Sequence, residues 1–181
     1  LLLSSCAFNY NGVVLTHDFL SVSYYGSELG YASTKGGMPT VVVGNPSAID
    51  KIGFDRLVTN IMYGKNPGIA VKFSTEINDP QRWLYRVIMY FDPPAGISGQ
   101  TACNPDASLQ SAPKNDNQLV LLAAFCRGDK SLSEVRGTTI RGPGTDSLSF
   151  RKLITHVLLN LFPTRNKHHE VDCRQTIPPC T

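Results

Sequence analysis

Residues 119–126 read LVLLAAFC, and residues 83–91 read WLYRVIMYF. Both stretches carry apolar side chains on both of their alternating faces, which is typical of central strands that are covered on each side. Neither approaches the roughly 20 apolar residues needed to span a bilayer. We therefore expect these two strands to form the centre of the sheet around which the rest of the chain folds.

Three further strands are predicted around this centre. The β-branched run at residues 39–43 ends in a Gly-Asn-Pro turn, and a brief strand is expected over residues 71–74. The more polar stretch at residues 132–140 follows a Gly-Asp turn, which predicts a hairpin with residues 119–126 and a place at or near an edge.

Two helices are predicted from apolar side chains at helical spacing. The first covers residues 54–62, and Gly64 closes it. The second covers residues 150–161, with Asp146 or Ser147 as the N-cap and Pro163 as the stop.

The order of these elements predicts an α+β fold. We expect a two-layer sandwich, with a mixed, largely antiparallel sheet of about five strands and two helices on one face. This domain covers residues 39–163. Residues 7–38 are interpreted as an extended tether or docking segment, and residues 164–181 as a polar, disulfide-closed tail.

The connection over residues 92–117 is rich in Gly and Pro and is too long for a plain hairpin. A long loop inside a compact domain is usually functional or held by a cross-link. We therefore expect a functional or disulfide-tied loop between the two central strands.

The composition argues against a nucleic acid partner. The 181 residues carry a net charge of only +3, and no block of Lys and Arg alternates with aromatic residues. A protein that neutralises a row of phosphates needs a stronger basic surface.

The five cysteines are Cys6, Cys103, Cys126, Cys173 and Cys180, and none belongs to a Cys-x-x-Cys pair. Cys173 and Cys180 bracket a short loop, and Cys103 lies in the long loop, from which it could reach Cys126 at a strand end. These two disulfides would indicate an exported protein and would leave Cys6 as the one unpaired thiol.

The sequence Leu3-Ser4-Ser5-Cys6 resembles the lipobox of bacterial lipoproteins. The resemblance implies that residues 1–6 are the remnant of a lipoprotein signal with its acylation site. It also implies that Cys6 carries a diacylglyceryl group, with palmitate-type acyl chains, and becomes the first residue after signal cleavage. It also implies a lipid-anchored protein on the periplasmic side of the bacterial envelope. In lipoproteins of this type, Asp directly after the acylated cysteine favours retention in the inner membrane. This chain has Ala7 at that position, so the resemblance implies anchoring in the outer membrane.

Candidate chemistry is sparse elsewhere. His168, His169 and Glu170 are weak metal candidates, because adjacent histidines project in different directions and structural zinc needs ligands that converge. No motif of a nucleophile, base or phosphate-binding loop is recognisable, so no catalytic residue and no cofactor are predicted.

Aromatic residues are concentrated in the N-terminal segment. Tyr and Phe side chains amid Gly, Ser and Asn can anchor a segment onto another protein, or they can pack on this protein's own sheet. The residues concerned are Phe8, Tyr10, Phe19, Tyr24, Tyr25 and Tyr31.

Three functions are consistent with these patterns. The first is a non-catalytic, lipid-anchored structural or accessory subunit that docks onto a larger membrane-associated assembly. The alternative is a periplasmic binding module for a small ligand or cell-wall polymer, with the loop over residues 92–117 as the rim of its site. A hydrolase without a local signature is the third.

The lipobox makes one direct prediction. Mass spectrometry of the native protein should find a diacylglyceryl group on Cys6 and no residue before it, because the signal peptidase cleaves there. An unmodified chain that retains Leu1 to Ser5 would contradict the lipoprotein interpretation.

Overall fold

The computed structural model describes residues 7–10, 12–33, 37–77, 83–113, 117–142, 144 and 147–169, and for residues 7–10, 17 and 18 it describes the backbone alone. Cys6, Glu170, Cys173 and Cys180 lie outside the described residues. Lipidation of Cys6 and the Cys173–Cys180 pair therefore stay predictions.

The described strands form one seven-stranded sheet, in the order β1-β2-β7-β6-β5-β3-β4. β3 pairs in parallel with β4 and β5, and all other neighbours pair antiparallel, so the sheet is mixed and largely antiparallel, as predicted. The strands are β1 (Ala7–Tyr10), β2 (Val13–Leu20), β3 (Met38–Val43), β4 (Phe73–Ser74), β5 (Tyr85–Phe91), β6 (Gln118–Arg127) and β7 (Lys130–Ile140).

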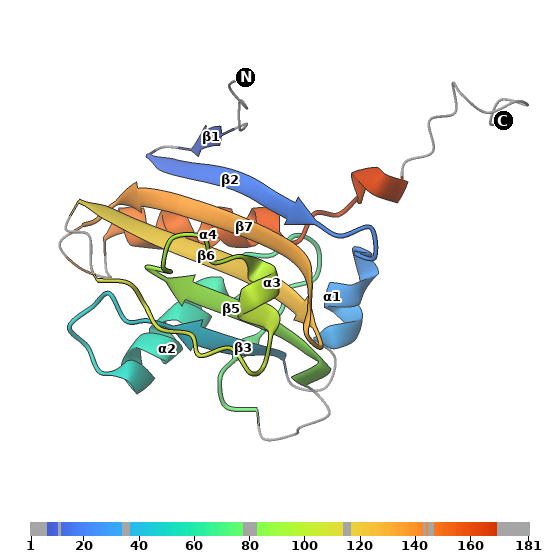
Figure 1. Ribbon diagram of the computed structural model, residues 1–181, viewed down its shortest axis with the longest axis horizontal. Coiled ribbons are helices and arrows are strands. Elements are labelled where there is room, and N and C mark those ends of the chain that lie inside the picture. The colour runs from blue at the N-terminus through green and yellow to red at the C-terminus, as the bar shows by residue number, and fades with distance from the viewer. Residues whose placement is uncertain are drawn as a thin grey trace, which may run out of the picture.

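Both predicted helices are confirmed and lie on one face of the sheet. They are α2 (Lys51–Met62) and α4 (Leu148–Leu161), and three short helices accompany them: α1 (Ser27–Ala32), α3 (Gly99–Cys103) and the 3-10 helix η2 (Lys167–His169). Ser147 caps α4 by accepting a hydrogen bond from the backbone N–H of Phe150. Figure 1 shows α3 in front of the sheet, with α4 behind it.

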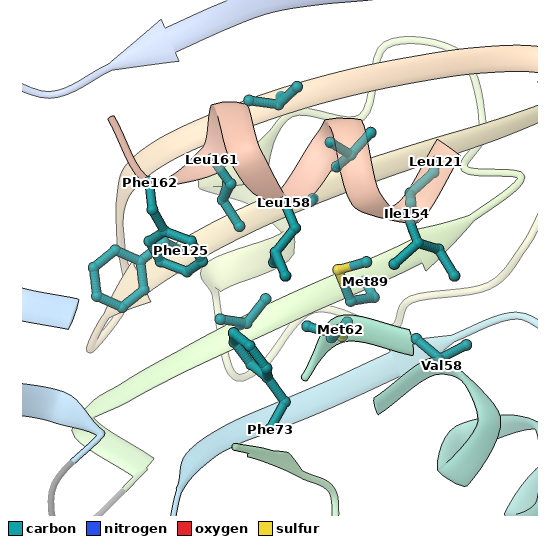
Figure 2. Packing of buried hydrophobic residues seen from close by; sticks show 14 of the residues in the cluster. Val58, Met62, Phe73, Met89, Leu121, Phe125, Ile154, Leu158, Leu161 and Phe162 are labelled. Atoms are coloured by element: carbon teal, nitrogen blue, oxygen red, sulfur yellow. The ribbon is translucent and has the colours of Figure 1, made fainter. Parts of the chain in front are cut away.

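The main core lies between the sheet and the two long helices. Alternate residues of β6, such as Leu121 and Phe125, belong to this core, and Figure 2 shows Leu121 near Ile154 of α4 and Phe125 near Phe162 at the end of that helix. Each such side chain contributes about 1.5–3 kcal/mol when it is fully buried. The apolar stripe of α4 that is buried here consists of Phe150, Leu153, Ile154, Val157, Leu158 and Leu161.

The N-terminal segment differs from the predicted tether. β2 pairs along β7, and Val13 and Leu15 are buried in the main core, so residues 7–38 supply two strands and a helix to the domain. The interpretation of this segment as extended is therefore wrong for β1, β2 and α1. The period-2 pattern that predicts a strand was weak here, because the register shifts between Thr16 and Phe19.

Gly137 allows close approach of β7 to α4. A Cβ atom at this position would lie 2.5 Å from Val157 Cγ2 and 2.7 Å from Leu153 Cδ1, both within the packed core. We predict that Gly137→Ala lowers the free energy of unfolding by about 1–3 kcal/mol through overpacking, measured by urea denaturation. Gly30→Ala is the control, because a Cβ there meets nothing within 4 Å. Equal urea midpoints for wild type and Gly137→Ala would contradict the close packing.

Candidate functional site

The second face of the sheet is also apolar at its centre. Side chains of β5 and β6 on this face form a separate buried cluster with residues of α3. The buried members are Ile88, Tyr90, Ala102, Cys103, Leu122, Ala124 and Cys126. α3 and the loop around it therefore take the place that the long helices occupy on the other face.

A disulfide joins Cys103 at the end of α3 to Cys126 in β6, as predicted, with a Cα–Cα distance of 5.6 Å. It bridges 23 positions of the sequence and holds the long loop against the sheet. The expectation of a disulfide-tied loop is thereby confirmed.

Asp92 fixes the start of the loop. Its backbone has a φ of 48°, a left-handed conformation that Asp adopts more readily than most residues. Its carboxylate accepts hydrogen bonds from Val120 N (3.3 Å) and from Arg141 Nη2 (2.8 Å), and its carbonyl oxygen accepts one from Ala112 N (2.8 Å). The buried carboxylate of Asp92 thus ties the start of the loop to β6 and to Arg141, which follows β7, and its carbonyl oxygen holds Ala112 near the other end of the loop.

Further hydrogen bonds hold the middle of the loop. Tyr90 Oη donates to Gln110 O (2.6 Å), and Arg136 Nη2 donates to Ile97 O (2.7 Å). Ser111 Oγ donates to Phe91 O (2.9 Å). These bonds fix the loop relative to the sheet. The space between the loop and the sheet is therefore pre-formed.

That space is a cavity of about 420 Å³, which falls in the range of small-molecule sites. It lies where β3 and β5 meet the segment that follows α3, and most of its lining is apolar. The lining residues are Val41, Val43, Trp83, Arg86, Ile88, Ala102, Asn104, Pro105, Ala107 and Leu109.

Arg86 places a positive charge in this apolar wall. Its side chain is half-buried and donates from Nη1 to Trp83 O (3.3 Å) and from Nη2 to Cys103 O. Burial lowers the pKa of the Arg86 guanidinium from its usual value, and the charge of Asp129 partly offsets this. The second contact also links Arg86 to the disulfide residue Cys103.

Trp83 is the one tryptophan of the sequence and lines the same cavity. Its Nε1 donates to Ile77 O at 3.1 Å, so the polar atom of the indole already has an acceptor. The ring therefore contributes mainly apolar surface, and its fluorescence reports on this site alone.

The predicted partner-binding aromatics separate into two groups. Tyr24 is buried and donates from Oη to Pro163 O (2.8 Å), so for this residue the prediction of a partner contact is wrong and packing on its own sheet is correct. Phe19, Tyr25 and Tyr31 are 43%, 56% and 73% exposed. For Phe8 and Tyr10, on β1, only the backbone is described.

The weak metal candidates do not gather into a site. His168 and His169 lie in η2, and the His169 ring lies against the Tyr25 ring, with the centroids 4.5 Å apart and the planes tilted by 35°. In the described part of the chain, no three His, Cys, Asp or Glu side chains come together to hold a metal ion. Glu170 lies beyond that part.

No helix among the described ranges is both long and apolar enough to cross a bilayer. In comparisons with protein-family models, curated proteins and solved structures, no significant match to this chain was found. The function must therefore be inferred from the chain's own residues.

Sequence reasoning located the rim of the cavity but missed its wall. The length and composition of residues 92–117 predict a functional loop, whereas the pattern around Arg86, Trp83 and Val41 predicts only strands. The available signal was Arg86 itself, a charged residue inside the run WLYRVIMYF, where every other side chain is apolar or aromatic.

The disulfide should stabilise the domain because it lowers the conformational entropy of the unfolded chain. A closed loop of this length is worth about 3 kcal/mol, so the double variant Cys103→Ala/Cys126→Ala should unfold at a lower urea concentration. Wild type treated with a reductant should shift in the same direction, while the double variant should not respond. Identical unfolding midpoints for oxidised wild type and variant would contradict the structural role.

Proposed function

We propose that this domain is a non-catalytic binding module of the bacterial envelope that holds a small, largely apolar ligand under the disulfide-tied loop. The single observation that carries the proposal is the cavity of about 420 Å³, with apolar walls and one charged side chain. Binding sites typically combine mostly apolar lining with a few polar groups that orient the ligand.

The anchoring of the loop supports a binding role. The cavity lies between a sheet and a segment that is fixed by a disulfide, by the Asp92–Arg141 ion pair and by hydrogen bonds. A pre-formed site loses little conformational freedom when a ligand enters, which favours affinity.

The proposed location follows from the cysteines. A buried structural disulfide is typical of exported proteins, because the cytosol keeps thiols reduced. Acylation of Cys6 would then hold the module at a membrane, on the periplasmic side of the outer membrane in our proposal.

A second candidate is the accessory subunit that docks onto a larger membrane-associated assembly. Exposed apolar side chains near α1 favour it: Tyr31 and Ile69 are 73% and 83% exposed. Ile69 lines a hollow of about 260 Å³ together with Leu29 of α1. This surface fits a protein partner better than a small ligand, because no charged side chain lines the hollow.

Filling the cavity tests the binding proposal. Ala107→Phe places a ring in the cavity from the loop side, where Ala107 is only partly buried. Wild type should bind the neutral apolar fluorophore N-phenyl-1-naphthylamine saturably, and the variant should bind it at least about tenfold more weakly.

The matched control is Ala95→Phe, because Ala95 is an exposed residue of the same loop outside the cavity lining. It should bind the fluorophore as wild type does. Equal binding by wild type and Ala107→Phe, or no saturable binding by wild type, would contradict the proposal and leave the surface near α1 as the functional site.

A further inference from the structure

Two other arginines of this fold pair with largely buried carboxylates. Arg127 Nη1 lies 2.7 Å from Glu28 Oε1, and Arg141 Nη2 lies 2.8 Å from Asp92 Oδ2. In both pairs the carboxylate is largely buried, so each arginine has a fixed counter-charge in the native state.

Arg86 is held differently. Its two hydrogen bonds go to the carbonyl oxygens of Trp83 and Cys103, which orient the guanidinium but carry no net charge. Across the described residues, no carboxylate forms an ion pair with it. A guanidinium also has more N–H donors than these two acceptors use.

The surroundings of Arg86 make this charge costly. The cavity wall around it is formed by Val41, Val43, Ile88 and Leu109, and a half-buried charge in such a wall has lost part of its hydration. An anion that enters the cavity would regain that energy through a charge-assisted, bidentate contact.

We infer that the cavity binds a single-chain amphiphilic carboxylate, such as a fatty acid anion. The carboxylate would pair with Arg86, and the alkyl chain would lie against the apolar side chains of β3 and of the segment after α3. This inference rests on the proposed function, because it names the ligand class for the same site. A neutral lipid or a cationic amphiphile would bring no anionic group to Arg86.

The test is a titration followed by Trp83 fluorescence. The probes are decanoate, decanol and decyltrimethylammonium, each below its micelle or solubility limit, so that chain length is constant and only the head group varies. Decanoate should bind wild type at least about tenfold more tightly than either of the other two probes. A tenfold difference in affinity corresponds to the free energy of about one charge-assisted hydrogen bond.

Two variants assign the difference to the guanidinium. Arg86→Gln should lose about tenfold or more in decanoate affinity while its decanol affinity stays within about twofold, and Arg86→Lys should retain a preference for decanoate. Arg56→Gln is the surface control, because Arg56 is exposed on α2 and pairs with Glu76 at 3.0 Å. Unchanged decanol binding shows that the Gln variant still has a folded cavity.

The outcomes separate the two proposals. Equal affinities for decanoate and decanol in wild type, or unchanged decanoate binding in Arg86→Gln, would overturn the carboxylate preference while the apolar site stands. Wild type that binds none of the three probes would overturn both the preference and the proposed function.

Discussion

β5 and β6 carry apolar side chains on both of their faces, so the sheet has to be shielded from water twice. On one face α2 and α4 provide this cover, with the long regular stripes that amphipathic helices supply. On the other face the cover is α3, a helix of only five residues, and the irregular loop around it. Because so short an element cannot pack over the whole face by itself, the disulfide and the Asp92–Arg141 pair hold it in place.

The cavity follows from this unequal covering. α3 packs mainly over β6 and β7, and the segment that follows it reaches the half of the sheet near β3. Among the described strands, β4 pairs with β3 only at Met38 and Pro39, and none lies beyond Val41 and Val43. The result is an apolar hollow at one edge of the sheet, lined also by Arg86, which forms no ion pair with a carboxylate of the described residues.

The sequence was most informative where periodicity was long and uninterrupted. The stripe of α4 and the apolar runs of β5 and β6 predicted those elements, and the position of Cys126 at a strand end predicted its disulfide. The strand β2 was missed because Thr16-His17-Asp18 interrupts its alternation at a register shift. The cavity could not be predicted, since β3 lies beside β5 only after the chain has passed through α2 and β4. Val41, Arg86 and Ala107 therefore meet through topology, which no local pattern encodes.

A crystal structure of the protein with bound decanoate would test the central claim most directly. The account predicts one ligand in the cavity, with its carboxylate about 3 Å from the Arg86 guanidinium and its chain against Val41 and Val43. A ligand bound at the hollow near α1, or a cavity closed by the protein's own loop side chains, would contradict it.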